Sequence, residues 1–432
     1  MGKKFLIIPS CSDFNRGDQA LVWETERFTK EAGFEGDYYF MAEANEAVEQ
    51  SVAHGIKPVI PLLEHPSRKF KSRDNVKMHF GLILKWGIVS LADLIWSLIL
   101  LTPLRDIVAI AFSKEKKNTY SLFKEADAVF VKGGGFIHSY GGVTATYYIY
   151  FQLYHIFLSQ SLGKEVYIFP NSFGPFEGLG VKAMVNRAFK KSKFVLAREC
   201  RSAEMCKNEL NIDVKPFPDF GFFLPNGNYT NKEAFKKQLN LPCERKLVAI
   251  TARPHRFPHS QNPAQAYSDF ISTMRGFAKW LYKQGFFPVF IEHVYAINNH
   301  ENDSYCIDEI VRGLEDGTYA YFRNRDINCM DLKLTYSFFD YIVGTRFHSV
   351  IFSMANKVPG IAITYVGNKG EGIMEDMAMG DFYIKIADVN TQSLIERFNY
   401  LVANREEVVK RINYYLLEAN VKRNKLLGIM KA

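Results

Sequence analysis

Cysteine is scarce in this sequence. The chain of 432 residues has six, at positions 11, 200, 206, 243, 306 and 329. No two of them form a CxxC pair, and their scatter is not that of a disulfide framework, so a zinc ribbon and a small disulfide-stapled module are both excluded. We expect a protein of the reducing cytoplasm whose activity needs no metal and no organic cofactor.

Long blocks of one charge are also absent. The chain carries 54 Lys and Arg against 46 Asp and Glu, a formal net charge of +8. The positive residues form no stripe with interleaved aromatic side chains, so we expect no nucleic-acid partner. An anionic small molecule or a lipid head group accounts for the excess equally well. Part of the excess is local, since residues 57–117 contain eleven basic and five acidic residues.

Only one hydrophobic run is long enough to be compared with a membrane span. It covers residues 82–101, but it contains Lys85 and Asp93, and Pro103 follows it. A carboxylate near the centre is costly in a bilayer, so we expect no transmembrane helix. Two interpretations remain, a core helix or a helix that lies on a membrane surface. The second is favoured by basic residues upstream of the run: Arg68, Lys69, Lys71, Arg73 and Lys77.

Short β-branched or aromatic runs alternate with helical stretches along most of the chain. This alternation is typical of βαβ units and a parallel sheet. The expected strands are residues 5–9, 38–41, 128–132, 166–169, 194–197, 247–251, 287–292, 341–345 and 360–365. After the first strand, we expect Asp18 to cap a helix that ends at Gly33.

A break rich in Pro, Gly and Asn near residues 225–245 predicts a domain boundary. We therefore expect an α/β protein with two doubly wound, Rossmann-like domains that face a cleft, the default place for a site. The N-terminal domain is expected over residues 1–228, with an apolar and basic helical insert at 62–117. The C-terminal domain is expected over residues 245–388, and residues 389–432 are expected to form helices across the hinge.

Small and polar residues follow two strands of the first half. The loop 10–18 leads into a helix, where backbone N–H groups can meet an anion or a sugar hydroxyl. The alternative is a plain turn in which Asn15 and Gly17 take positive φ. The triple glycine 133–135 permits close approach of a ligand or another backbone, but it is neither a dinucleotide fingerprint nor a Walker A motif. His138 follows it, with a substrate contact and a structural role both open.

The strongest candidate lies in the second half. A strand ends at Gly344, and Arg346 and His348 then open the next helix. Arginine offers a planar fork to a carboxylate or phosphate, histidine titrates near neutral pH, and a helix N-terminus favours anions. Arg253 follows the strand 247–251 and is expected at the same edge of the sheet. The alternative for His348 is a histidine buried in the core, and the alternative for Arg253 is a basic residue in a surface loop.

Taken in order, these motifs resemble the polysaccharide pyruvyl transferase family over about residues 5–385. The resemblance rests on N-x-G-D at Asn15 to Asp18, glycines 133–135, Asn171 to Pro175, Ala197 to Glu199 with Ser202, Pro218 with Asp219, R-x-H at Arg346 and His348, and Tyr365 with Lys369. Two details depart from the family pattern. Phe347 stands where an aliphatic residue is usual, and the gap between Tyr365 and Lys369 is one residue longer. Neither removes a chemical group.

The resemblance implies a fold similar to GT-B glycosyltransferases. It also implies transfer of a pyruvyl group from phosphoenolpyruvate, as co-substrate, to two hydroxyls of a sugar, which forms a cyclic ketal and releases phosphate. The setting would be the biosynthesis of a bacterial surface polysaccharide, a capsule or exopolysaccharide. Arg346 and His348 would be the catalytic residues, and both would bind the donor together with Arg253 and Lys369. His348 would supply the proton, while the arginines would offset charge on the leaving group.

The acceptor is expected against the first domain. The candidate residues on that side are Asn15, Asp18, Gly134, Gly135 and His138. If the acceptor is a lipid-linked oligosaccharide, we expect the apolar and basic region 57–117 to dock the protein on the inner face of the membrane. Two other functions remain open: a GT-B glycosyltransferase that uses a nucleotide sugar, with Glu371 at the ribose, and a non-catalytic sugar-binding subunit of a glycan complex.

Overall fold

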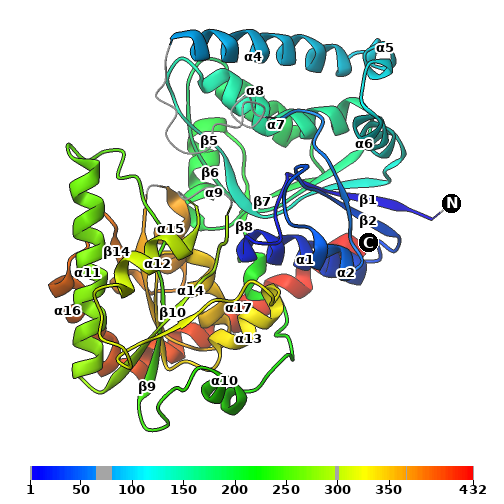
Figure 1. The fold of residues 1–432 in the computed structure, drawn as a ribbon. Coiled ribbons are helices and arrows are strands. Elements are labelled where there is room, and N and C mark those ends of the chain that lie inside the picture. Colours follow the sequence, from blue (N-terminus) through cyan, green and yellow to red (C-terminus); the bar gives the residue numbers. More distant parts are fainter. Residues whose placement is uncertain (1, 65–79, 297–300, 366, 432) are drawn as a thin grey trace. The chain divides into compact units, whose positions relative to one another are not determined.

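The computed structural model describes residues 2–64, 80–296, 301–365 and 367–431. The chain forms two compact units (Figure 1). Unit 1 consists of Met1–Asp13, Leu21–Asp219 and Leu427–Ala432, and unit 2 consists of Phe14–Ala20 and Phe220–Leu426. The segment 14–20 therefore belongs to the second unit although it precedes most of the first. The change of unit after Asp219 comes before the break expected at 225–245.

Unit 1 is built on an eight-stranded parallel sheet. Seven strands follow the order β3-β2-β1-β4-β6-β7-β8, and β5 pairs with β6 off this path. The strands are β1 (Lys4–Ile8), β2 (Asp37–Met41), β3 (Lys57–Val59), β4 (Ala128–Val131), β5 (Gly134–Tyr140), β6 (Glu165–Glu177), β7 (Phe194–Ala197) and β8 (Lys215–Pro216). In the centre of the sheet, Leu6 of β1 lies beside Tyr39 on one side and Val129 on the other.

Helices cover both faces of this sheet. They are α1 (Arg16–Glu31), α2 (Glu49–Ala53), α4 (Phe80–Leu100), α5 (Arg105–Ile110), α6 (Lys114–Glu125), α7 (Ala145–Ser161), α8 (Val181–Lys190) and α9 (Cys200–Leu210). Figure 1 shows α1 and α2 on one face and α7 and α8 on the other, with α4 and α5 beyond α7. The central strands β1 and β4 are almost wholly apolar because helices cover both faces of the sheet there.

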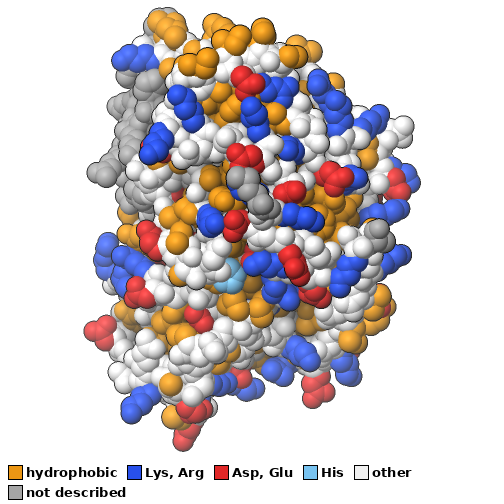
Figure 2. All heavy atoms as spheres, turned by 90° about the vertical axis from the view of Figure 1, so that its right-hand side faces the viewer, with side chains coloured by type: hydrophobic (Ala, Val, Ile, Leu, Met, Phe, Trp, Pro, Cys, Tyr) orange, Lys and Arg blue, Asp and Glu red, His pale blue; other side chains and the backbone are white. Residues whose placement is uncertain are grey.

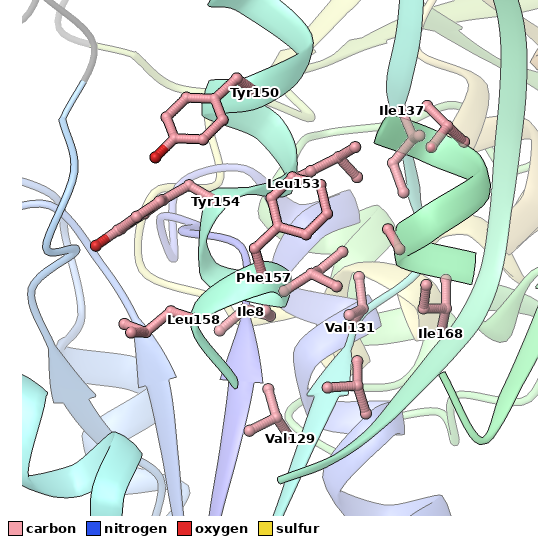
Figure 3. Close-up of a cluster of buried hydrophobic side chains, with 14 of the residues drawn as sticks. Ile8, Val129, Val131, Ile137, Tyr150, Leu153, Tyr154, Phe157, Leu158 and Ile168 are labelled. Atoms are coloured by element: carbon pink, nitrogen blue, oxygen red, sulfur yellow. The ribbon is translucent and has the colours of Figure 1, made fainter. Parts of the chain in front are cut away.

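The core of unit 1 follows from the two-residue period of a strand. Along β1, Leu6 and Ile8 belong to the cluster that packs with α7, while Phe5 points to the other face and contacts Tyr38 and Phe130. Figure 3 shows the first of these layers, in which Leu153 and Phe157 of α7 lie toward the side chains of the strands while the rings of Tyr150 and Tyr154 point away from them. The labelled residues of α7 are Tyr150, Leu153, Tyr154, Phe157 and Leu158. Burial of this apolar surface is the main source of stability.

The long hydrophobic run forms α4, which packs on α7 with one side only. Asp93 is 3% exposed and accepts a hydrogen bond from Trp96 Nε1 at 2.9 Å. Ser97 Oγ lies 2.9 Å from the Tyr150 hydroxyl of α7. Among the described residues, no helix combines the length and apolarity that crossing a bilayer requires. A plain core helix is excluded as well, because several large apolar side chains of α4 are exposed.

Unit 2 contains a six-stranded parallel sheet. Its order is β11-β10-β9-β12-β13-β14. The strands are β9 (Lys246–Thr251), β10 (Phe286–Ile291), β11 (Ala320–Phe322), β12 (Tyr341–Gly344), β13 (Gly360–Thr364) and β14 (Tyr383–Lys385). The order reverses direction at the pair β9 and β12, so the loops after these two strands lie at the switch point where α/β sheets bind ligands.

The helices of unit 2 connect these strands in the βαβ manner. They are α10 (Lys232–Gln238), α11 (Pro263–Lys283), α12 (Asp303–Val311), α13 (Cys329–Tyr336), α14 (Phe347–Ala355), α15 (Asn368–Asp376), α16 (Thr391–Ala403) and α17 (Arg405–Lys431), with short 3₁₀ turns η1 (Phe220–Phe222) and η2 (Gly380–Phe382). α14 is short and buried along its whole length. It therefore fixes its first residues firmly against the sheet.

The expected strands are confirmed as β1, β2, β4, β6, β7, β9, β10, β12 and β13. The sequence did not indicate β3, β8, β11 and β14, which are two or three residues long and lie at or near sheet edges, nor β5, which is rich in glycine. Such segments carry too few apolar residues for a period to be seen.

The start of α1 differs from the expectation. The helix begins at Arg16, so Asp18 lies in its first turn and does not cap it. Asn15 is the capping residue, because its Oδ1 accepts the Asp18 N–H at 3.3 Å while its Nδ2 donates to the Asp18 carboxylate at 2.8 Å. Neither Asn15 nor Gly17 has a positive φ. The expected cap at Asp18 and the expected positive φ at Asn15 and Gly17 are therefore both wrong.

A buried histidine of unit 1 predicts how stability depends on pH. His155 Nε2 accepts the Leu62 N–H at 3.2 Å, and burial, aided by the charge of Lys116, lowers the pKa of His155 to about 3. In the unfolded chain its pKa is about 6.5. The contribution of His155 to the free energy of unfolding is therefore fully present above about pH 6.5. It falls as the pH drops toward 3, by up to about 1.4 kcal/mol per pH unit.

We expect His155→Gln, which keeps an acceptor for Leu62 but has no proton to bind, to flatten this dependence. The measurement is the urea midpoint of both proteins between pH 6.5 and 4.5, where the variant should lose less stability than the wild type. Parallel curves would show that His155 is not the group that titrates.

Candidate functional site

The loop between β12 and α14 carries Arg346 and His348 into the edge of the unit 2 sheet. Arg346 is the N-cap residue of α14, and His348 is the second residue of the helix and 9% exposed. A Cβ on Gly344 would lie 2.8 Å from both Thr251 Oγ1 and Ser349 Oγ. Glycine is therefore required for the chain to turn this closely against its neighbours.

The loop after β9 is hydrogen-bonded to the loop between β12 and α14. The Thr345 N–H donates to the Thr251 carbonyl at 3.0 Å, and the Arg253 N–H donates to Thr345 Oγ1 at 2.9 Å. The Arg253 guanidinium lies over the ring of Tyr365, 4.7 Å from its centroid. The structure thus brings Arg253 to the loop that holds Arg346, as expected for the ends of adjacent parallel strands.

Lys369, in the first turn of α15, reaches His348. Its Nζ lies 3.4 Å from His348 Nδ1. An ammonium group can only donate, so this contact favours an imidazole whose Nδ1 accepts and whose Nε2 carries the proton. The protonated nitrogen is then the one that can act on a ligand.

The N-x-G-D segment lies against this same histidine. Asn15 forms an antiparallel bridge with Val294, the Arg16 N–H donates to the His293 carbonyl, and the Tyr295 N–H donates to the Phe14 carbonyl. A Cβ on Gly17 would lie 2.2 Å from His348 Nδ1. The absence of a side chain at Gly17 is what lets the imidazole lie directly on the first turn of α1.

This placement corrects one expectation. Asn15 and Asp18 were expected on the side of the first domain, but they belong to unit 2, close to His348. The cause is main-chain pairing of the segment with the residues after β10.

Asp303 holds Arg346 in position. The Arg346 Nε donates to Asp303 Oδ1 at 2.7 Å, and the N–H groups of His293 and Val294 both donate to Asp303 Oδ2 at 2.9 Å. The Asp303 side chain is fully buried, and 11% of the Arg346 side chain is exposed. The carboxylate is thus fully satisfied, and it fixes the guanidinium at the N-terminus of α14.

Positive charge is concentrated around a second histidine. His293 follows β10, is 2% exposed, and lies near the ring of Phe352. Burial lowers its pKa well below the usual value, and electrostatic interactions with four neighbours lower it further. These neighbours are His348, Arg346, Arg16 and Lys369. His293 is therefore neutral near pH 7, and the groups around it form a cluster that favours an anion.

The candidates of unit 1 lie on and beside β5. Gly134 begins this strand, and His138 lies further along it with its Nδ1 3.0 Å from the Gly135 carbonyl oxygen. Burial lowers the pKa of His138. Its ring neighbours Tyr140, which is 52% exposed, and Tyr148. The result is an aromatic patch beside a glycine-rich strand.

The other motifs of unit 1 form one buried network. Arg198 is 1% exposed, donates to Ser172 Oγ at 2.8 Å and pairs with Asp219 at 2.9 Å. Ser172 in turn donates to Glu199 Oε2 at 2.7 Å. A Cβ on Gly135 would lie 3.2 Å from Arg198 Nη2. Because its guanidinium is buried and bonded to Ser172 and Asp219, Arg198 has a structural role next to Gly135.

Three residues of the unit 2 site were missed from the sequence: Arg16, His293 and Asp303. Arg16 lies inside the N-x-G-D motif, and His293 directly follows an expected strand, so the rule that sites gather at strand ends could have found both. Asp303 gave no such signal, because a carboxylate in a polar stretch is usually exposed.

The contact between Gly17 and His348 makes a structural prediction. In Gly17→Ala the imidazole must turn away, so we expect the side-chain NMR signals of His348 to move. The protein has ten histidines, which makes histidine-selective labelling practicable. Gly428→Ala is the control, because a Cβ there would meet nothing within 4 Å. Unchanged His348 signals in Gly17→Ala would contradict the packing described.

Comparisons with known proteins agree with this arrangement. The family model for polysaccharide pyruvyl transferase matches residues 15–368. The amylovoran biosynthesis protein AmsJ of Erwinia amylovora is 23% identical over 319 residues, which cover 70% of this chain and 72% of that protein.

Two solved structures show the fold. A glycosyltransferase from Rickettsia africae has a TM-score of 0.51 and 15% identity, over 99% of this chain and 97% of that one. Anabaena Alr3699/HepE, in complex with UDP and glucose, has a TM-score of 0.53 and 12% identity, over 99% and 98% of the two chains. The expected GT-B-like fold with two Rossmann-like units is confirmed. With a family model that matches most of its length, the chain belongs to the polysaccharide pyruvyl transferase family.

Proposed function

We propose that this protein transfers a pyruvyl group from phosphoenolpyruvate to two hydroxyls of a sugar during synthesis of a bacterial surface polysaccharide, an exopolysaccharide or capsule. The observation that carries the proposal is the contact of Lys369 with His348, in the first turn of a helix whose N-cap position is Arg346. This arrangement places a proton carrier among fixed positive charges. Family membership and the biosynthetic relative support the general role.

The proposed donor site suits a ligand with two anionic groups. Phosphoenolpyruvate carries a carboxylate and a phosphate, and Arg346, Lys369 and Arg253 are the cations assigned to them. The helix N-terminus adds its own positive end. Three half-buried cations at one edge of the sheet favour an anionic ligand.

The proposed reaction begins with a proton on the methylene carbon of phosphoenolpyruvate. C2 then becomes an electrophile, and one sugar hydroxyl forms a C–O bond to it and loses its proton. The bond from C2 to the phosphate oxygen breaks next, and phosphate leaves with the electron pair. A second hydroxyl attacks C2 and loses its proton, which closes the ring. The products are a pyruvyl ketal and inorganic phosphate.

The roles of the side chains follow from where charge and protons move. His348 is assigned to deliver the proton from Nε2, the nitrogen that does not face Lys369, as the imidazolium that forms when the anionic donor binds, and it recovers a proton from the attacking hydroxyl. Arg346 and Arg253 offset the negative charge that builds on the departing phosphate. None of these steps calls for a metal or an organic cofactor, and metal independence stays a prediction.

Each unit by itself offers candidate contacts that we propose for an acceptor sugar. In unit 1, His138 and the exposed ring of Tyr140 offer a surface for the face of a sugar, and Gly135, which is exposed where Gly134 is buried, leaves its backbone open to the hydroxyls. In unit 2, the amide and carboxylate of Asn15 and Asp18 are suited to hydroxyl groups. A lipid-linked oligosaccharide at the cytoplasmic face of the inner membrane is the acceptor we favour.

Donor binding can be tested before the acceptor is known. We expect calorimetry to detect phosphoenolpyruvate binding that falls about tenfold or more in Arg346→Ala, which loses a charged hydrogen-bond donor. Lys369→Met should weaken binding too while leaving the pair of Arg346 with Asp303 intact. Arg411→Ala, on α17, removes the same charge outside the site and should bind normally.

A protein that binds uridine diphosphate but not phosphoenolpyruvate would instead be a nucleotide-sugar glycosyltransferase. Equal binding by the wild type and both site variants would exclude the proposed donor site.

The proton-transfer role of His348 predicts a separate effect on the glycan. In cells that carry His348→Gln in place of the wild type, we expect the pyruvate content of the surface polysaccharide to fall by a factor of about 100 or more, since general acid catalysis of this kind contributes about 10²–10⁴-fold. Donor binding by the purified variant should change much less. Cells with His54→Gln, a change in unit 1, serve as the control. Normal pyruvate content with His348→Gln would favour a non-catalytic subunit.

A further inference from the structure

An apolar stripe runs along the exposed side of α4. It consists of Leu84, Ile88, Leu91, Ile95 and Leu98, which are between 46% and 61% exposed. The steps between them are four, three, four and three residues, so all five lie on one face of the helix. Large aliphatic side chains in a continuous row are unusual on a surface that meets only water.

The opposite face of α4 is held by the rest of unit 1. Asp93 and Leu100 are buried, and Ser97 bonds to Tyr150 of α7. At 100° per residue these three positions lie half a turn from the stripe. The exposure of the stripe is therefore built into the packing of the helix.

The apolar surface continues into the next helix. In α5 and just before it, Leu104, Ile107 and Ile110 are 59%, 65% and 74% exposed. Figure 2 shows hydrophobic side chains along the upper rim of the view, at the end of unit 1 that α4 and α5 form, with Lys and Arg side chains just below. We call these eight side chains of α4 and α5 the apolar strip.

Basic residues flank the apolar strip. Lys85, Lys114 and Lys117 are exposed. The acidic residues of these helices are largely used within the protein, because Asp93 is buried and Asp106 pairs with Lys124 at 3.1 Å. In the sequence, the fifteen residues before α4, 65–79, add five Lys and Arg against one Asp. An apolar face with cations at its border complements the acyl chains and anionic head groups of a bilayer.

We propose that the apolar strip docks this protein on an anionic lipid bilayer, with α4 and α5 lying in the interface. At 1.5 Å per residue, the 21 residues of α4 extend over about 30 Å parallel to the membrane. This proposal concerns where the protein works and does not depend on the donor or on ketal formation.

A second copy of the chain fits the strip less well. Protein interfaces are enriched in aromatic residues, Met and Arg at their centre, whereas the strip contains only Leu and Ile. Two copies joined at this face would also bring their flanking lysines together. A bilayer of anionic lipid has neither difficulty.

The test is flotation of the purified full chain with vesicles of equal parts phosphatidylglycerol and phosphatidylethanolamine, beside vesicles of phosphatidylcholine. We expect the wild type to float with the anionic vesicles and Ile88→Asp combined with Ile95→Asp to bind them about tenfold less or weaker still. Leu417→Asp combined with Val421→Asp is the matched control, since these residues of α17 are 67% and 64% exposed and also lie on one face of their helix.

Two further measurements keep the test decisive. Circular dichroism melts should give the same midpoint for both double variants, because only exposed side chains change. Lys114→Glu combined with Lys117→Glu, which leaves the apolar side chains in place, should also weaken binding to the anionic vesicles.

The proposal is overturned if the wild type fails to float with anionic vesicles, or if the strip variant floats as well as the wild type. A dimer interface would also overturn it. In that case the wild type would sediment as a dimer and bind no vesicles, and the strip variant would sediment as a monomer. Loss of phosphoenolpyruvate binding in Arg346→Ala would leave all of these outcomes unchanged.

Discussion

The packing of the His348 imidazole on the backbone of Gly17 is the contact on which the candidate site depends. The segment 14–20 comes from the beginning of the chain, and main-chain bonds to residues 293–295 hold it in unit 2. The backbone of Gly17 then packs against Nδ1 of the imidazole, and Lys369 Nζ lies close to the same nitrogen. These contacts restrict the orientation of the ring, and Nε2 is the nitrogen that does not face Lys369. Such preorganisation is what proton transfer at a fixed carbon requires.

The electrostatics of the site follow from the same arrangement. Burial lowers the pKa of His293 and keeps it neutral, and the charges of Arg346, Arg16 and Lys369 act in the same direction. Asp303 offsets part of this charge, but its oxygens are used by Arg346 and two backbone N–H groups. The positive charge concentrated at this place favours an anionic ligand. This is the physical reason for favouring phosphoenolpyruvate over a neutral sugar at this place.

Much of the fold could be predicted from the sequence, because buried parallel strands are continuous apolar runs and glycine or polar residues follow them. The end of β12 with Arg346 and His348 was found in this way. The position of Asn15 and Asp18 was not, since pairing between residues 15 and 294 leaves no local pattern in either segment. Asp303 was missed for a related reason: its burial depends on Arg346, far away in the sequence. The helix α4 was recognised as apolar, but which of its faces is exposed depends on Ser97 and Leu100 contacting the rest of unit 1.

The central claim is that a proton is added to the methylene carbon of phosphoenolpyruvate during transfer to a sugar. It can be tested by running the transfer in D₂O, with phosphoenolpyruvate and lipid-linked acceptor extracted from cells that lack this protein, and examining the pyruvyl methyl group by mass spectrometry. The account predicts one deuterium in that methyl group, and release of one phosphate for each ketal formed. A ketal methyl group without deuterium, or glycan modification without any phosphoenolpyruvate consumed, would contradict it.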